Sequence, residues 1–340
     1  MSEVKNESKY ILEVKDLHTT FSTDQGGVVR AVNGVSFNLE PGKILGIVGE
    51  SGSGKSVTAY SIMRILSENG GITGGQVLYK GQDITKWSEK QMQAFRGKCC
   101  SIIFQDPMTS LNPVYTIGNQ IVEVILLHTK KSKQEAWARA KELLELVGIN
   151  EPDRRLKQYP HELSGGMRQR VMIAIALACE PKLLIADEPT TALDVTIQAQ
   201  ILELMNDLRH KLGMSIIMIT HDLGVVAQMC EKIAVMYAGH IVEYGTTDEI
   251  FYNPQHEYTK GLINSIPKLN AEGKERLVPI EGQPVDLLNP PAGCPFAPRC
   301  KNCMKVCLNK MPPKTELSDT HYTYCWLRQK EEFEKGGKAE

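Results

Sequence analysis

The chain has 340 residues, 42% of them hydrophobic, and its 39 basic and 40 acidic side chains give a formal net charge of -1. This size predicts one large globular domain with a smaller second part, and the balanced charge argues against nucleic acid or an anionic membrane as the main partner. No apolar run is long enough to span a bilayer, and residues 1–8 lack a secretory apolar region, so we expect a cytosolic chain.

Two segments near the N-terminus alternate apolar and polar residues. They cover residues 11–21 and 28–39 around a turn at 24–27, which predicts an antiparallel pair of strands. Phe21 ends the first segment. Its ring is either buried in the hairpin or exposed and able to stack on adenine, and the pattern favours neither.

A glycine-rich loop, residues 49–56, follows an apolar strand pattern and precedes a helix pattern over 57–66. It has the form G-x-x-x-x-G-K-S, in which the glycines let backbone N–H groups turn toward phosphate oxygens. Lys55 adds a positive charge, and the Ser56 hydroxyl can bind magnesium. A glycine-rich turn that binds nothing does not explain the full pattern. The expected nucleotide ligands are Gly49, Glu50, Ser51, Gly52, Ser53, Gly54, Lys55, Ser56 and Val57.

Further strand patterns predict an α/β core that contains a helical insertion. Short strands are expected at 76–79 and 99–104, and the second ends in Gln105. Prolines and turn residues interrupt regular structure after Gln105, and helical periodicity follows, so residues 106–177 form the predicted insertion. Inside it, a cluster able to bind an anion opens a helix: Ser164, Gly165 and Gly166.

The last core strands end in polar side chains. A buried strand pattern over 183–188 ends in Asp187 and Glu188, which point to opposite faces and so need not share a function. Another pattern over 215–220 ends at His221. A hairpin is expected at Ala238-Gly239, between strands over 233–237 and 240–244.

Five of the nine cysteines fall between residues 294 and 325 and indicate a separate C-terminal module. In a cytosolic chain, thiols or metal ligands are expected more than disulfides. The spacing fits either a structural zinc ion or a four-iron, four-sulfur cluster, and Cys303 is the member left over. The alternative is reduced cysteines that pack a small extension. The four expected ligands are Cys294, Cys300, Cys307 and Cys325.

Taken together, these motifs resemble the nucleotide-binding subunits of ABC transporters over about residues 11–261. The resemblance identifies the Walker A loop at 49–56, the Q-loop at Gln105, the signature at 163–167, the Walker B strand at 183–188, the D-loop at 192–194 and the switch histidine at His221. It implies an α/β P-loop NTPase (RecA-like) core with an antiparallel β subdomain, an inserted α-helical subdomain and a small Cys-rich C-terminal extension.

The expected boundaries follow from the motifs and the composition. The nucleotide-binding domain covers residues 1–260 and holds the helical insertion at about 106–177. A Cys-rich metal-binding extension covers 261–329. The charged tail at 330–340 is expected to be disordered.

The resemblance also implies an ATP hydrolase and assigns a role to each motif. Lys55 contacts the phosphates, and Mg²⁺ is held by Ser56, Gln105 and Asp187. Glu188 is the base or water-orienting group, and His221 contacts the γ-phosphate. Ser164, Gly165, Gly166 and Asp194 serve a nucleotide held by a second subunit, either a homologous partner or another copy of this chain.

The stretch 105–113, the helix segment 167–170 and the C-terminal cysteines resemble the ATPases of dipeptide and oligopeptide importers. This resemblance implies two transmembrane permease subunits, an extracytoplasmic peptide-binding protein that acts indirectly, a place on the cytoplasmic face of the membrane, no nucleic-acid partner, and iron–sulfur in preference to zinc. The alternatives are an ATPase of a nickel or other small-solute importer, a soluble ABC-type ATPase of translation or DNA maintenance, and a redox sensor.

Overall fold

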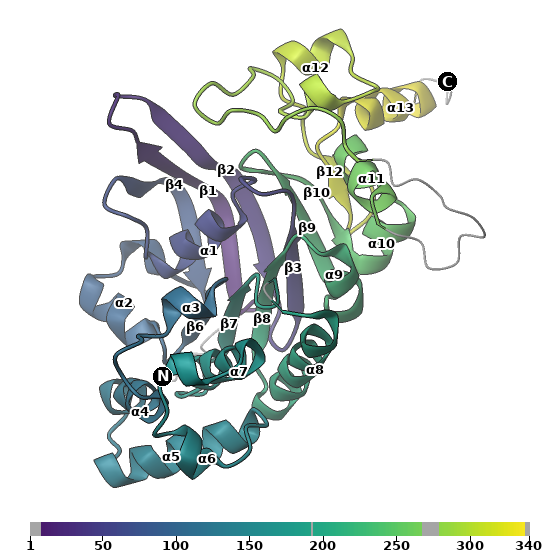
Figure 1. Cartoon of the computed structure of the whole chain (residues 1–340). Coiled ribbons are helices and arrows are strands. Elements are labelled where there is room, and N and C mark those ends of the chain that lie inside the picture. The colour runs from purple at the N-terminus through teal and green to yellow at the C-terminus, as the bar shows by residue number, and fades with distance from the viewer. Residues whose placement is uncertain (1–7, 192, 267–278, 337–340) are drawn as a thin grey trace, which may run out of the picture. The chain divides into compact units, whose positions relative to one another are not determined.

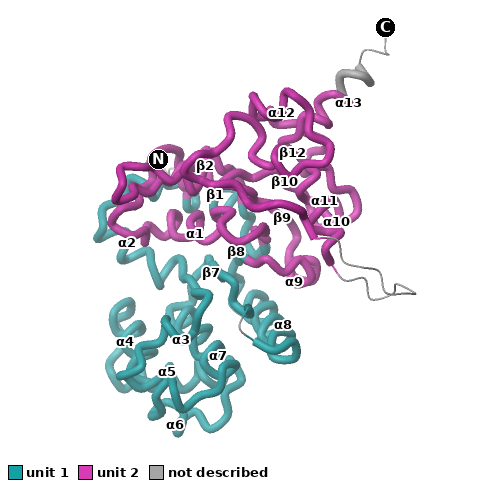
Figure 2. Tube along the Cα trace, turned by 45° about the horizontal axis from the view of Figure 1, so that its top comes forward, with its two compact units in different colours: residues 1–12, 39–44, 79–219 teal, residues 13–38, 45–78, 220–340 magenta. Residues whose placement is uncertain are grey.

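The computed structural model describes residues 8–191, 193–266 and 279–336. The chain folds into two compact units, which Figure 2 draws in teal and magenta. Unit 1 comprises residues 1–12, 39–44 and 79–219, and unit 2 comprises residues 13–38, 45–78 and 220–340. Figure 1 labels most of the helices and strands of both units.

Three parallel strands form the sheet of unit 1, in the order β6, β7 and β8. They are β6 (Cys100–Ile103), β7 (Leu183–Asp187) and β8 (Ser215–Thr220). Every residue of β7 and β8 is buried, which explains their unbroken apolar runs. The three strands predicted from these runs are confirmed, although β6 ends one residue before the exposed Phe104.

Helices fill the stretch between β6 and β7, as predicted. Ser132 closes a capping box at the start of one of them, and Ser164 caps the helix of the signature. The predicted break after Gln105 contains one helical turn, because Asp106 caps it and Pro107 suits its first position. The helices are α3 (Pro107–Ser110), α4 (Ile117–His128), α5 (Lys133–Leu146), α6 (Pro152–Arg155) and α7 (Gly165–Ala176), with a 3₁₀ turn η2 (Pro160–Glu162).

Unit 1 contains further elements that the sequence analysis did not predict. Ser88 begins a short helix with a capping box to Gln91, and Asp194 begins the longest helix of the unit by accepting a bond from the Ile197 N–H. These elements are β5 (Gln82–Asp83), η1 (Ile84–Lys86), α2 (Glu89–Phe95) and α8 (Val195–Leu212).

Unit 2 contains two groups of strands. In one group β1 lies between β2 and β4, and in the other the order is β11, β12, β10, β9 and β3. β3 runs parallel to β9, whereas β9 and β10 form an antiparallel hairpin. The strands are β1 (Leu12–Ser22), β2 (Val28–Leu39), β3 (Ile44–Val48), β4 (Gly70–Tyr79), β9 (Lys232–Tyr237), β10 (His240–Thr246), β11 (Thr315–Glu316) and β12 (Tyr322–Thr323).

The predicted hairpin at Ala238-Gly239 is confirmed. Both residues have a positive φ, 48° and 80°, which suits a tight two-residue turn between right-twisted strands. The two segments predicted before the glycine-rich loop are β1 and β2, and the strand predicted at 76–79 begins earlier, at Gly70.

The helices of unit 2 are short. The helix predicted over 57–66 is α1, which ends at Met63 where Arg64 takes a left-handed conformation. The others are α9 (Leu223–Met229), α10 (Thr247–Tyr252), α11 (Glu257–Asn264), η3 (Ala297–Arg299), α12 (Lys305–Asn309) and α13 (Trp326–Gly336), and α1 spans Lys55–Met63. Disorder was expected from residue 330 onward, yet α13 continues to Gly336, and residues 337–340 lie outside the described ones.

The C-terminal segment adds strands to the sheet of unit 2. β12 pairs antiparallel with β10, with Glu243 opposite Thr323 and Tyr244 opposite Tyr322. The Tyr244 and Tyr322 rings stack with centroids 5.1 Å apart. This segment is therefore packed as part of unit 2.

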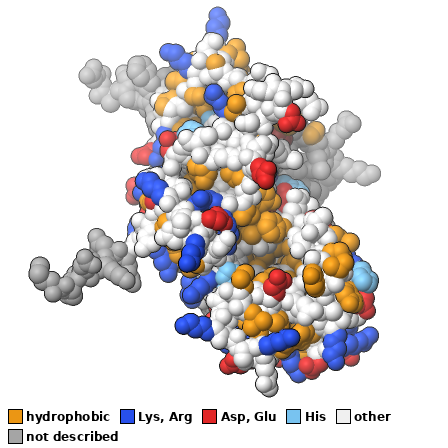
Figure 3. All heavy atoms as spheres, turned by 90° about the vertical axis from the view of Figure 1, so that its left-hand side faces the viewer, with side chains coloured by type: hydrophobic (Ala, Val, Ile, Leu, Met, Phe, Trp, Pro, Cys, Tyr) orange, Lys and Arg blue, Asp and Glu red, His pale blue; other side chains and the backbone are white. Residues whose placement is uncertain are grey.

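Charged side chains of both signs are interspersed on the face drawn in Figure 3. No helix in the described part of the chain is long and apolar enough to cross a bilayer.

Candidate nucleotide site

The glycine-rich loop lies in unit 2 between β3 and α1. Lys55, the first residue of α1, is 5% exposed and donates from Nζ to the carbonyl oxygens of Gly49 at 2.8 Å and Glu50 at 2.9 Å. Gly54 precedes the helix with φ 98°, and a Cβ there would lie 2.4 Å from the Ala31 oxygen. Only glycine therefore fits at the point where the loop turns into the helix.

Ser53 joins the loop to the hairpin of β9 and β10. Its carbonyl oxygen accepts a 2.9 Å bond from the Gly239 N–H, and its side chain is 4% exposed. Within the described residues, Ser53 Oγ has no hydrogen-bond partner. A buried hydroxyl in this state fits an additional acceptor or donor, such as a phosphate oxygen.

The other predicted ligands in the loop differ in accessibility. Ser51 and Gly52 are exposed, and Ser56 and Val57 are half-buried at the start of α1. A Cβ on Gly52 would meet no atom within 4 Å, and its φ of 75° turns the loop at an open point. An anion approaching from solvent therefore reaches this part of the loop.

Phe21, at the end of β1, is half-buried. Its ring lies against Gly70 of β4, so close that a Cβ on Gly70 would stand 2.3 Å from Phe21 Cε1. The ring is thus partly packed in the sheet and partly accessible, which leaves room for the predicted stacking on adenine.

In unit 1, the end of β7 separates the two predicted carboxylates. Asp187 is fully buried, whereas Glu188 is half-buried and has a φ of 48°. The Glu188 N–H donates to the Ile219 oxygen at 2.8 Å, which ties the turn to β8. The two carboxylates thus differ in burial, and the prediction that they need not share a function stays a prediction.

Glu188 accepts two side-chain hydrogen bonds. Gln105 Nε2 and Thr191 Oγ1 each donate to Glu188 Oε2 at 2.9 Å. The structure thus brings together two of the predicted site residues, which stand 83 positions apart in the chain. Thr191 was not predicted as a site residue, and its only signal in the sequence is its position three residues after Glu188.

The signature and the D-loop meet in unit 1. Ser164 caps α7 by accepting from the Met167 N–H at 3.4 Å, and Asp194 Oδ1 caps α8 by accepting from the Ile197 N–H at 3.0 Å. A Cβ on Gly166 would lie 2.8 Å from Ile197 Cγ2, so this glycine allows the two helix starts to approach. Ser164 and Asp194 therefore both have structural roles as caps.

His221 directly follows β8 and is exposed. The next residue, Asp222, caps α9 by accepting from the Gly224 N–H at 2.8 Å. The histidine therefore stands at a sheet end, where a parallel sheet commonly binds its ligand.

The four predicted cysteine ligands line one cavity of about 20 Å³ in unit 2, together with His256 and Phe296. Burial raises the pKa of Cys294 to about 12 and that of Cys300 to about 11, which favours neutral thiols. Cys303 is exposed and does not line this cavity, in line with its prediction as the odd member.

The arrangement does not support the predicted metal site. Among the residues that the structure describes, no group of three or more His, Cys, Asp or Glu side chains is placed to hold a metal ion. The cavity has room for about one water-sized sphere, which is less than a four-iron, four-sulfur cluster occupies. The iron–sulfur prediction therefore has no support in the arrangement of these thiols.

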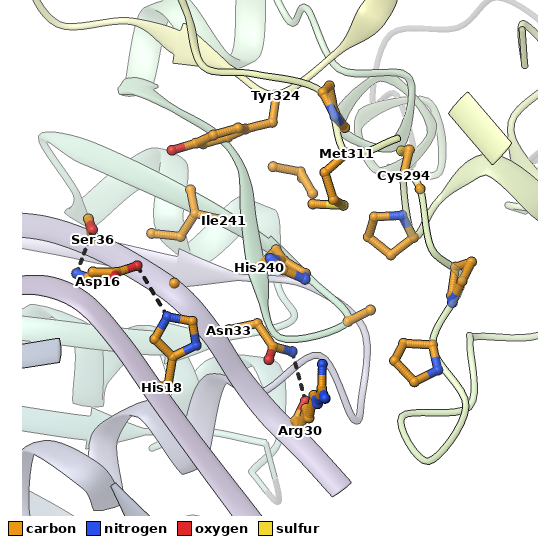
Figure 4. A pocket seen from close by; sticks show the side chains of 18 of the residues that line it. Asp16, His18, Arg30, Asn33, Ser36, His240, Ile241, Cys294, Met311 and Tyr324 are labelled. Atoms are coloured by element: carbon orange, nitrogen blue, oxygen red, sulfur yellow. Dashed lines mark hydrogen bonds and ion pairs between the residues drawn. The ribbon is translucent and has the colours of Figure 1, made fainter. Parts of the chain in front are cut away.

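A second cavity in unit 2, of about 1110 Å³, contains none of the predicted nucleotide ligands (Figure 4). On one side lie sheet residues such as Asp16, His18 and Arg30, and on another lie Met311 and Tyr324 of the C-terminal segment. His18 Nε2 and Asp16 Oδ1 are 3.2 Å apart. This cavity is distinct from the glycine-rich loop.

Two family models match the chain. The one described as "ABC transporter" matches residues 32–191, and the one described as "Oligopeptide/dipeptide transporter, C-terminal region" matches residues 242–307. The oligopeptide transport ATP-binding protein OppD of Bacillus subtilis (strain 168) is 58% identical over 93% of this chain and 88% of its own length. The chain belongs to the ABC transporter family.

Other relatives of this ABC transporter family member are similar over most of their length. The dipeptide transport ATP-binding protein DppD of Bacillus subtilis (strain 168) is 56% identical over 94% of this chain and 95% of its own. Among solved structures, the ATP-binding cassette MJ0796 bound to ADP and Pi has a TM-score of 0.63 and 27% identity, and it covers 69% of this chain and 98% of its own. The structure of cbiO1 from Clostridium perfringens has a TM-score of 0.62 and 29% identity over 72% and 92%.

Proposed function

We propose that this chain is the ATP-binding and ATP-hydrolysing subunit that powers import of dipeptides or oligopeptides through a membrane ABC transporter. The observation that carries the proposal is the 58% identity to an oligopeptide transport ATP-binding protein over 93% of the chain. The match to the model described as "Oligopeptide/dipeptide transporter, C-terminal region" at residues 242–307 supports the same substrate class.

Different residues are proposed to bind the phosphates and to hold Mg²⁺. The backbone of residues 49–56 and Lys55 bind the phosphates, and Ser56, Gln105 and Asp187 would hold Mg²⁺. When bound, Mg²⁺ neutralises charge on the phosphate oxygens.

Glu188 orients or deprotonates the attacking water, and the bonds from Gln105 and Thr191 fix its carboxylate. His221 contacts the γ-phosphate, and Phe21 stacks on adenine.

The signature is proposed to act on the nucleotide of a second ATPase subunit, a homologous partner or another copy. Ser164, Gly165 and Gly166 lie at the start of the twelve-residue helix α7, where backbone N–H groups and the helix dipole favour an anion. Ser164 and Gly165 are exposed, which suits contact with a partner's γ-phosphate.

The stretch that follows Gln105 is proposed to contact the permease subunits. Met108 is 60% exposed, Val114 71% and Tyr115 55%, which is unusual for three large apolar side chains within eight positions. The location would then be peripheral, on the cytoplasmic face of the membrane, with two permeases and an extracytoplasmic binding protein completing the importer.

The four cysteines of the C-terminal module remain a proposed ligand set for iron–sulfur, with zinc as the alternative. Support comes from the family resemblance alone, since the cavity that the four thiols line has room for about one water-sized sphere. Metal and sulfide analysis of anaerobically purified protein distinguishes an iron–sulfur cluster, a zinc site and a metal-free module. Iron with sulfide that disappears in Cys307→Ser supports the cluster, zinc supports the ligand set alone, and metal-free protein contradicts both.

Uptake by vesicles that contain this chain, its permeases and its partner ATPase tests the substrate class. ATP-dependent accumulation of labelled dipeptides or oligopeptides is expected, and nickel should neither accumulate nor compete. Accumulation of nickel without peptide would instead favour the small-solute importer.

A further inference from the structure

Glu50, the first variable position of the glycine-rich loop, is held by side chains from much later in the chain. Its N–H donates to Tyr258 Oη at 2.8 Å. Its two carboxylate oxygens accept from Arg299, with Nη1 to Oε2 at 2.6 Å and Nη2 to Oε1 at 3.0 Å. This is a bidentate, charge-assisted pair, the geometry that most strongly fixes a carboxylate in direction as well as distance.

Arg299 is itself fixed from several sides. Its side chain is 4% exposed, and its Nε donates to the Glu281 oxygen at 3.0 Å. Nη2 also donates to the Ile280 oxygen at 3.2 Å, and Nη1 to Tyr237 Oη at 3.3 Å. A guanidinium with this many partners has few alternative positions, so it holds Glu50 at a defined point.

Arg299 belongs to the same short segment as the buried cysteines. It ends η3, in which the Ala297 N–H donates to the Cys294 oxygen at 3.0 Å, and it directly precedes Cys300. The guanidinium also lies 5.9 Å from the ring of Phe296, which lines the cysteine cavity. The packing of the C-terminal module therefore fixes the position of the Arg299 guanidinium group.

We propose that Arg299 is a positioning residue for ATP binding, which fixes the glycine-rich loop through Glu50 and makes nucleotide affinity depend on the C-terminal module. The inference rests on the proposed ATP-binding function. A loop that binds phosphate through backbone N–H groups binds best when those groups are oriented beforehand, because ordering them on binding costs conformational entropy. The Arg299–Glu50 pair orients the backbone of the glycine-rich loop at its N-terminal end before the nucleotide binds.

The test measures MgATP affinity and turnover of the full-length protein with Arg299→Met. Loss of the bidentate pair between Arg299 and Glu50 should weaken MgATP binding about tenfold. Turnover at saturating MgATP should change less than the affinity, because Arg299 does not touch the reacting atoms. Lys301→Met is the matched control, because the ion pair of Lys301 with Glu281 at 3.7 Å joins two exposed side chains. The affinity of this variant for MgATP should equal that of the wild type.

A double-mutant cycle separates positioning from general stability. Glu50→Gln should weaken MgATP binding by a similar factor, and adding Arg299→Met to it should cause little further loss. Arg299→Lys should recover part of the affinity, since it restores the charge without the fork. If Arg299→Met fails to fold, Glu50→Gln alone tests the claim.

Wild-type affinity in folded Arg299→Met or in Glu50→Gln, or fully additive losses in the cycle, would overturn the inference. If the wild-type protein itself bound no MgATP, the proposed function would be wrong, and the inference that rests on it would be wrong as well. The two failures are therefore distinguishable within one set of titrations.

Discussion

Lys55 combines near-complete burial with a positive charge, and its ammonium group lies on two carbonyl oxygens of its own loop. Lys55→Ala should reduce MgATP affinity by about tenfold or more, because a charge-assisted bond to phosphate is lost. Equilibrium titration measures the change. Lys314→Ala, which removes one partner of an exposed 2.7 Å ion pair with Glu316, should bind normally. Equal losses in both variants would contradict a specific role.

His256 is a buried neutral histidine, and burial lowers its pKa to about 4. Its ordinary pKa is about 6.5, so between pH 4 and 6.5 the unfolded chain binds more protons than the folded one. The free energy of unfolding should therefore rise with pH across this window and level off above it.

His256→Asn tests this pH dependence. Asn can still cap α11, as His256 Nδ1 now does by accepting from the Tyr258 N–H at 3.1 Å. The slope of unfolding free energy against pH between 4 and 6.5 should fall by up to about 1.4 kcal/mol per pH unit. Urea unfolding at several pH values measures it. An unchanged slope would show that other groups carry the acid sensitivity.

The sequence predicted residues whose function depends on local spacing, such as Lys55 in its loop and Glu188 at a strand end. It did not predict the Arg299–Glu50 pair, because these residues stand 249 positions apart and nothing local in either segment requires the other. The Glu188–Gln105 bond was likewise beyond prediction as a contact, although both residues were singled out.

At the level of elements, Gly118 of α4 allows α5 to pack closely. A Cβ there would lie 2.3 Å from Trp137 Cζ3 and 2.8 Å from the Leu156 oxygen. Gly118→Ala should lower the free energy of unfolding by about 1–3 kcal/mol, because the indole and the backbone must both shift. Urea unfolding compared with Gly71→Ala, whose Cβ meets nothing within 4 Å, isolates the steric effect. Equal stability of the two variants would show that the helices adjust freely.

Strands were easier to predict than helices in this chain. The buried parallel strands β7 and β8 are continuous apolar runs, so β8 was predicted with its observed limits and β7 only one residue too long, through Glu188. Helices α8 to α11 show weaker patterns, and their starts depend on caps such as Asp194 and Asp222. Asp194 was assigned to the D-loop, so its role as a helix cap was not predicted. Helix α13 is so rich in charge that composition indicated disorder.

In the whole molecule, the proposed role of the signature requires a second ATPase subunit. Gly165→Asp tests this requirement, because a Cβ there would come no nearer than 3.8 Å to Leu193 and an acid suits the first turn of a helix. The variant should fold and bind MgATP normally, yet the carboxylate would repel a partner's γ-phosphate.

Steady-state ATPase assays give the outcome for Gly165→Asp. A dimer in which both subunits carry Gly165→Asp should not hydrolyse ATP. A dimer of one mutant and one intact subunit should hydrolyse ATP at only one of its two sites. Normal hydrolysis in the mutant would contradict the shared-site arrangement.

In the proposed mechanism this chain hydrolyses ATP with Glu188 as the group that activates water. The most direct test measures MgATP binding and single-turnover hydrolysis by Glu188→Gln beside Glu180→Gln, whose glutamate also has a positive φ but is exposed and paired with Arg139. We expect Glu188→Gln to bind MgATP at least as well as the wild type and to hydrolyse it at least about a hundredfold more slowly, while Glu180→Gln binds and hydrolyses MgATP like the wild type. Near-normal hydrolysis by Glu188→Gln would contradict this mechanism.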